Sequence, residues 1–169
     1  MITPEYCALM ARYNSWQNAE LSTSLENLSD ADLRADRGAF FGSIFRTINH
    51  LLWGDTLWIS RFDGGQGPAE TDLSKTDTTD TTATLAEWTL ARGAMDRRIL
   101  DWANSTKPED LSGDLTWYSG SIQSEISKPR AMCIVQFFNH QTHHRGQVHA
   151  MLGAAGAPMY TTDVPFLPE

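Results

Sequence analysis

Large apolar side chains recur every three or four positions along four segments of this chain, the spacing of one face of an α-helix. Thr3 and Pro4 supply an N-cap and a first-turn proline for the first segment. Pro129 takes the first-turn position of the fourth segment, and Gly153 and Gly156 end it. The pattern predicts four long helices, over residues 4–27, 39–62, 83–103 and 129 to about 155.

The connections between these segments differ in character. Residues 29–32 read as a turn with capping residues, and residues 63–82, rich in Gly, Thr, Asp and Ser, read as a long solvated crossover loop. Between residues 111 and 127 the apolar pattern changes to period two around 118–121, which predicts a β-hairpin. Residues 157–169 contain three prolines and should form an extended tail over the helices.

These elements predict an all-α fold, a four-helix bundle with a small β-hairpin between the third and fourth helices. At 169 residues the chain fits one domain, residues 1–169. Hydrophobic residues make up 41% of it and there are six tryptophans, so we expect a packed core rather than disorder.

Charge and cysteine content exclude several classes of protein. The net charge is -8 with only 13 Lys and Arg residues, which argues against nucleic-acid binding. Cys7 and Cys133 fit neither a disulfide framework nor a paired zinc motif and read as small core residues. There is no apolar run of ~20 residues and no leader-like start, so we expect no membrane association and a cytoplasmic location.

The fourth segment carries the clearest chemical signal. His140 and His144 lie four residues apart on its apolar stripe, so in a helix the two imidazoles lie on one face and can share a metal ion. Two imidazoles hold a divalent ion weakly, and His50 on the second predicted helix is the best third ligand. A three-histidine site leaves one coordination position open, as catalytic metal sites do.

Each histidine also has a structural alternative. The pair can be buried polar residues that hydrogen-bond a neighbour, and His50 can be a core residue with satisfied nitrogens. The other two histidines, His143 and His149, point well away from His144 on an ideal helix and should lie at the surface or at an interface.

Several polar and aromatic residues are candidates for the surroundings of a metal. A ligating imidazole normally donates its second N–H to an acceptor, and the nearby candidates are Asn49, Asp55 and Gln147. Candidates for pocket walls are Arg92, Tyr13 and Trp16. Each of these six has an ordinary alternative, as a solvent-facing polar residue, an inward ion pair or a core aromatic.

Arg145 and Gly146 follow directly on His144. We expect Arg145 to form a salt bridge with an acidic group on an adjacent helix. A glycine inside a helix costs about 1 kcal/mol relative to alanine, so Gly146 should mark a close contact with another helix or with the hairpin.

Other catalytic motifs are missing from the sequence. It contains neither a glycine-rich phosphate loop nor a Gly-x-Ser-x-Gly nucleophile elbow, and it lacks the Glu-x-x-His pairs of di-iron bundles. A single metal ion with nitrogen ligands is the chemistry that remains.

The chain resembles the DinB/YfiT-like family, named for DNA-damage-inducible proteins. The segments that carry the resemblance are residues 10–16, 37–44, 47–55 and, most specifically, 138–147. It implies a four-helix bundle in up-down-down-up order, often dimeric, with a divalent ion such as zinc or nickel held by His50, His140 and His144. Related members of the wider superfamily are thiol-dependent transferases or isomerases that use mycothiol, bacillithiol or another small thiol.

These observations lead to one functional hypothesis and a rival. The hypothesis is a metal-dependent enzyme that acts on a small electrophilic substrate, either as a thiol-dependent S-transferase or as a hydrolase. We also expect the protein to be a homodimer. Its ion is zinc in the first instance, with nickel, iron or manganese as alternatives, and a low-molecular-weight thiol is a possible cosubstrate. The rival is a non-catalytic dimeric stress-response or interaction protein with a structural or adventitious metal.

Overall fold

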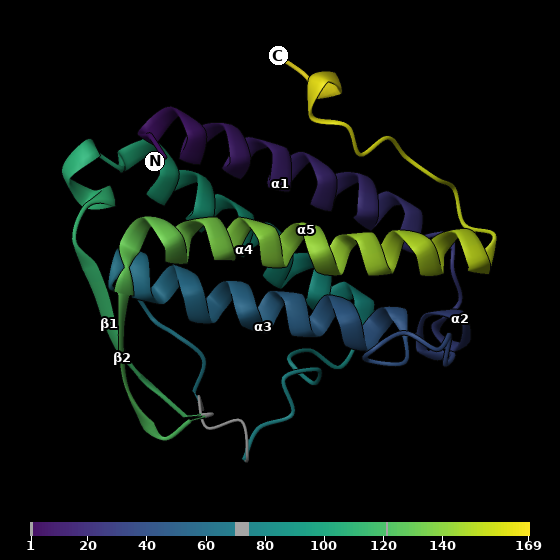
Figure 1. Ribbon diagram of the computed structural model, residues 1–169. Helices are drawn as coiled ribbons and strands as arrows, with labels where there is room; N and C mark the ends of the chain where they lie inside the picture. The colour runs from purple at the N-terminus through teal and green to yellow at the C-terminus, as the bar shows by residue number, and fades with distance from the viewer. Residues whose placement is uncertain (1, 70–74, 121) are drawn as a thin grey trace.

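The computed structural model describes residues 2–69, 75–120 and 122–169. The chain is mostly helical, with a small two-stranded sheet (Figure 1). The elements are α1 (Pro4–Leu25), α2 (Asp30–Arg34), α3 (Ile44–Asp63), α4 (Leu85–Ser105), β1 (Asp114–Ser119), β2 (Ser124–Pro129) and α5 (Arg130–Ala155), with 3₁₀ turns at Pro108–Leu111 and Val164–Phe166. The strands β1 and β2 pair antiparallel, with Trp117 opposite Ile126.

Side-chain caps decide where the long helices begin. Thr3, Ser43 and Thr84 each accept a hydrogen bond from the backbone N–H three residues further on. These bonds satisfy N–H groups that have no partner inside the helix. At their other ends, α3 and α5 stop at Gly64 and Gly156, which adopt left-handed conformations with φ of 71° and 72°.

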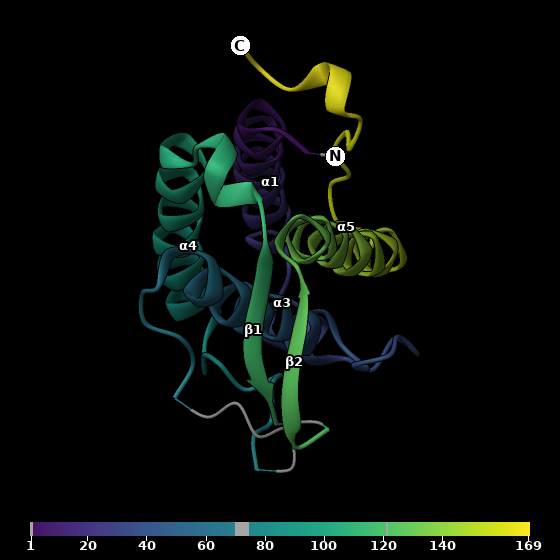
Figure 2. The same cartoon turned by 60° about the vertical axis from the view of Figure 1, so that its left-hand side comes forward.

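The four long helices lie side by side. The helix α1 contacts α4 and α5, and α3 contacts the same two helices. Figure 1 shows α1 and α5 running in one direction and α3 and α4 in the other. The hairpin projects from the start of α5, past the end of α3 (Figure 2). The core between the helices includes Leu21, Ile48, Trp88, Ile99, Phe137, Phe138 and Leu152.

A cluster of polar side chains crosses this core and takes a member from every long helix. Arg92 of α4 donates to Asp55 of α3 at 2.6 Å and pairs with Asp96, one turn along α4, at 2.9 Å. Asn18 of α1 donates to Asp96 at 2.8 Å, and Gln141 of α5 donates to Asp55 at 3.0 Å. Asp55 and Arg92 are 0% and 2% exposed, so these bonds form away from water.

The C-terminal tail follows α1, as predicted. Its backbone carbonyls accept hydrogen bonds from α1 side chains: Ser24 donates to Pro158 at 2.7 Å, Gln17 to Thr161 at 3.0 Å and Tyr13 to Thr162 at 2.6 Å. The tail therefore covers one side of the α1–α5 groove. No helix among the described residues is both long and apolar enough to cross a membrane.

Several predicted boundaries were wrong. The helix predicted from residue 39 begins at Ile44, because residues 39–42 form a turn in which the Gly42 N–H donates to the Ala39 carbonyl. Residues 30–34 form the short helix α2, since Ser29 and Asp32 complete a capping box where only a turn was predicted. Gly153 lies inside α5 rather than ending it.

The two predicted connections also differ from expectation. The strands extend to Ser119 and begin again at Ser124, so the hairpin turn lies later than the predicted 118–121; Ser121 lies outside the described residues. Residues 70–74 of the crossover lie outside them as well. The end of the crossover is not simply solvated, because Thr79 is 5% exposed and the Thr82 N–H donates to the Asn49 side chain at 2.7 Å.

The buried cluster should dominate the polar contribution to stability. Replacing Asp55 with alanine leaves Arg92 with one carboxylate fewer in a site without water, and we expect the free energy of unfolding to fall by about 3–5 kcal/mol. Replacing Asp30, whose pair with Arg34 is largely exposed, should cost less than about 1 kcal/mol. Urea denaturation of both variants measures the difference, and equal losses would contradict it.

Candidate metal centre

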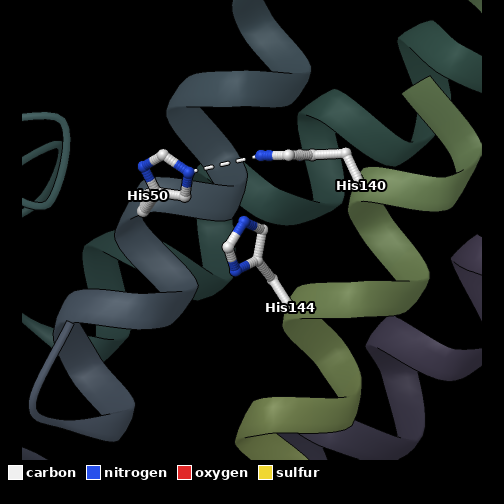
Figure 3. Close-up of side chains that lie close together, drawn as sticks. All are labelled: His50, His140 and His144. Carbon is white, nitrogen blue, oxygen red and sulfur yellow. Dashed lines mark hydrogen bonds between the residues drawn. The ribbon is translucent and has the colours of Figure 1, made fainter. Parts of the chain in front are cut away.

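Three imidazoles from two helices meet on one side of the core. His50 comes from α3, while His140 and His144 come from successive turns of α5. One ring nitrogen of each lies within 4.8 Å of the other two. The Nε2 atoms of His50 and His140 are 3.3 Å apart, and Figure 3 shows the three rings converging. Residues 90 positions apart in the sequence thus form one cluster of nitrogen donors.

Hydrogen bonds to the outer nitrogens orient two of the three rings. The Gln147 side-chain oxygen lies 2.8 Å from His144 Nδ1, and because this oxygen only accepts, Nδ1 carries the proton. The Thr78 hydroxyl lies 2.8 Å from His50 Nδ1 and can accept a hydrogen bond from its N–H in the same way. Both contacts leave Nε2 with its lone pair toward the centre of the cluster.

The third ring is positioned by a glycine. A Cβ atom at Gly54 would lie 2.7 Å from His140 Cε1, closer than real contacts allow. The His140 ring therefore lies directly against the α3 backbone, one turn after His50. Its Nδ1 is buried and has no hydrogen-bond partner among the described residues. Only glycine at position 54 leaves room for this imidazole.

Burial keeps the histidines neutral. It lowers the pKa of His50 to about 4, with a further contribution from His144. Burial followed by the charges of the other histidines lowers the pKa of His140 to about 3. The pKa of His144 is also lowered by burial, against the opposing effect of the hydrogen bond that it donates to Gln147. At pH 7 all three therefore present unprotonated nitrogen, the form that binds a metal.

A cavity of about 680 Å³ opens beside His50. Its apolar walls are Phe40, Phe41 and Trp53, and the Phe41 ring lies 4.1 Å from the His50 ring, centroid to centroid. Its polar wall includes Arg46 and Asp77, whose side chains pair at 3.3 Å. His50 is the member of the histidine cluster that lines this cavity.

The six residues predicted to surround the metal lie in different environments in the structure. Gln147 contacts His144, as the sequence suggested. Asn49 instead holds the crossover through Thr82, and Asp55 and Arg92 belong to the buried ion-pair cluster. Tyr13 and Trp16 pack edge to face on α1, and neither lines the cavity beside His50. Arg92 was rightly expected to point inward, but it is not a wall of this cavity.

Sequence reasoning missed three residues of this site: Gly54, Thr78 and Phe41. Gly54 could have been found, because it follows His50 by four residues and so lies on the same helical face. Thr78 gave no such signal, since it reaches His50 from a loop 28 residues away. Phe41 was expected inside a helix, whereas it belongs to the turn before α3.

Two predictions about the residues after His144 were wrong. Arg145 is 4% exposed, but none of the ion pairs found among the described residues includes it; its guanidinium lies 5.6 Å from the centre of the Tyr13 ring. A Cβ atom at Gly146 would meet nothing within 4 Å. The side chain at 145 packs over Tyr13 of α1 instead, and a side chain at position 146 would have no close neighbour.

The lowered histidine pKa values predict how stability changes with pH in the metal-free protein. The unfolded chain takes up protons at these positions below about pH 6.5, whereas the folded chain resists them until about pH 4. The free energy of unfolding should therefore decrease as the pH falls through this window. Urea denaturation at several pH values measures the slope.

The variant His140→Asn tests whether the histidine cluster causes this pH dependence of the free energy of unfolding. It removes one suppressed titration and leaves other groups unchanged, so its stability should depend less on pH between about 6.5 and 4 than that of the parent. An identical slope in both proteins would show that the cluster does not control this dependence.

Two comparisons relate this chain to known proteins. The family model described as DinB family matches residues 1–169, the whole chain, including the three histidines. A search of curated proteins found no match. Because the family model spans the full sequence, the chain belongs to the DinB family.

Proposed function

We propose that this protein is a metal-dependent enzyme in which His50, His140 and His144 hold one divalent ion. The observation that carries the proposal is the convergence of three ring nitrogens within 4.8 Å of one another. Membership of the DinB family supports it. In this proposal the four long helices form a four-helix bundle in up-down-down-up order, with the site between its second and fourth members.

The residues present fit such an ion. Two ligands on a tetrahedral zinc with bonds of ~2.1 Å are roughly 3.4 Å apart, and the Nε2 atoms of His50 and His140 are separated by 3.3 Å. The buried imidazoles are neutral, so no proton competes for their lone pairs. Three nitrogen donors favour zinc or another borderline ion such as nickel over magnesium or calcium, which prefer oxygen.

The chemistry follows from an open three-nitrogen site. When bound, the ion would lower the pKa of a thiol or a water molecule enough to make it a nucleophile near neutral pH. Gln147 and Thr78 fix the ring orientations, so that little reorganisation is required. Phe41 and Trp53 provide an apolar surface for the substrate and keep water from part of the site.

The cavity is large enough for a reaction with two substrates. Its volume of about 680 Å³ is in the range that holds a drug-sized ligand. This is room for a small thiol and an electrophile side by side, whereas hydrolysis needs room for one substrate and a water molecule. We therefore propose a thiol-dependent S-transferase, with a hydrolase as the second candidate.

Metal content gives the first test. Protein purified without a histidine tag should contain about one equivalent of divalent metal per chain, measured by elemental analysis. His144→Ala should lose it while keeping its helix content. His149→Ala is a matched control, because His149 lies on the same helix, contacts the Tyr160 carbonyl and is not in the cluster; this variant should keep its metal.

Two results would count against the site. The first is parent protein with less than a tenth of an equivalent, which would leave the catalytic proposal without its centre. The second is full metal retention in His144→Ala. If removing the metal unfolds the parent globally, the ion is structural, and the non-catalytic alternative is favoured.

Turnover tests the function itself. Metal-loaded protein is mixed with several low-molecular-weight thiols, each with a generic electrophile, and thiol consumption is followed. We expect catalysed consumption that disappears in His144→Ala and persists in His149→Ala. Electrophile breakdown without thiol consumption would indicate the hydrolase, and no turnover of either kind would favour the non-catalytic alternative.

A further inference from the structure

The charged residues around the cavity beside His50 have the opposite balance to that of the whole chain. Two basic residues, Arg46 and Lys75, line the cavity together with one acidic residue, Asp77. The chain as a whole has 21 Asp and Glu residues against 13 Lys and Arg residues. The wall next to the candidate metal ligand thus carries an excess of positive charge, which would attract a negatively charged group.

The helix fixes the position of Arg46 relative to the metal site. Arg46 precedes His50 by four residues on α3, so the two side chains lie on the same helical face, one turn apart. Both line the cavity. Side chains at this spacing start ~5–6 Å apart at their Cβ atoms, a distance that the long arginine side chain can cover. A ligand bound to an ion at His50 would therefore lie within reach of the guanidinium.

The guanidinium of Arg46 is accessible to such a ligand. Its side chain is 52% exposed, and within the described part of the chain its contact with Asp77 uses Nη2 alone, at 3.3 Å. An exposed ion pair of this kind contributes at most about 1 kcal/mol. An incoming anion can therefore share or replace the contact with Asp77 at little cost.

The apolar walls of the cavity complement this cation. Phe40, Phe41 and Trp53 present aromatic surfaces, and Phe40 is 83% exposed although it is apolar. Aromatic faces pack against the carbon skeleton of a ligand and leave its charged end to the polar wall. A ligand with a short apolar body and one negative end thus matches the cavity better than a neutral polar ligand does.

We propose that the thiol bound to the ion in this site carries a carboxylate, which Arg46 binds through its guanidinium. The inference rests on the function proposed above and adds the chemical class of the thiol. A carboxylate is the anion that suits arginine, because its two oxygens accept the two parallel N–H bonds of the planar guanidinium. Since Arg46 lies one helical turn from His50, the sulfur and the carboxylate of the thiol should be only a few bonds apart.

The test compares two thiols of the same shape and different charge. They are β-mercaptopropionate and its neutral amide, each titrated into the full-length protein loaded with Co²⁺, which accepts nitrogen ligands as zinc does. Coordination of the thiolate sulfur to cobalt produces a sulfur-to-metal charge-transfer band in the near-ultraviolet spectrum. The dissociation constant of each thiol is therefore measured without turnover.

We expect Arg46→Gln to weaken the binding of β-mercaptopropionate by about tenfold or more. Its affinity for the amide should change little, because the amide offers no charge to Arg46. Arg46→Lys keeps the charge but not the paired donors, so its affinity for β-mercaptopropionate should lie between those of the parent and Arg46→Gln. Arg97→Gln is the matched control, since it removes an exposed arginine of α4 that does not line the cavity; it should bind both thiols as the parent does.

Equal losses for the two thiols in Arg46→Gln would overturn the proposal, because Arg46 would then act only by holding the crossover through Asp77. An unchanged affinity for β-mercaptopropionate, or the same loss in Arg97→Gln, would overturn it as well. Each of these results leaves the metal centre in place. A parent protein that binds no cobalt would instead remove the proposed metal centre, and the carboxylate assignment with it.

Discussion

One hydrogen bond sets the register between the two helices that carry the histidines. Gln141 of α5 donates to Asp55 of α3 at 3.0 Å, and both side chains are fully buried. Gln141 is adjacent to His140, and Asp55 is adjacent to Gly54, against which the His140 ring lies. A slip of either helix would break this bond in a site where water cannot replace it. The same contact therefore holds the core and aligns the imidazoles.

Burial acts differently on the two kinds of polar group in this core. The carboxylates and Arg92 remain together because each has charged and hydrogen-bonded partners. The histidines have no acidic partner in the cluster, and burial holds them neutral. Burying neutral imidazoles whose lone pairs converge without a partner is energetically unfavourable, and a bound cation would remove that penalty. The carboxylates of the ion-pair cluster are thus already paired, whereas the three histidines could hold a metal ion.

Two consecutive residues of α5 face different sides of the molecule. His144 points toward His50 of α3 and the proposed metal centre, while Arg145 packs over Tyr13 of α1. A rotation of about 100° per residue separates the two directions. The tail completes the second side by occupying the donors of Tyr13 and Gln17. One rigid helix can therefore present two unlike chemical environments without any loop between them.

The sequence by itself determined the helical character, the hairpin and the histidine pair. Helical periodicity and capping residues act locally, and His140 and His144 share a face through their spacing alone. The same local rule placed Gln147 beside His144. Boundaries failed where local hydrogen bonds competed, as at the turn before α3 and the capping box of α2.

Only the tertiary structure decided what lies opposite each of those faces. The approach of His50 to His140 depends on how α3 packs against α5, which no spacing within either helix specifies. The same holds for Thr78, which reaches His50 from the crossover, and for Gly54, whose importance depends on the ring packed against it. Within the described part of the chain Arg145 forms no ion pair, because the nearby acids Asp55 and Asp96 are already bonded to Arg92, and that competition exists only in the folded core.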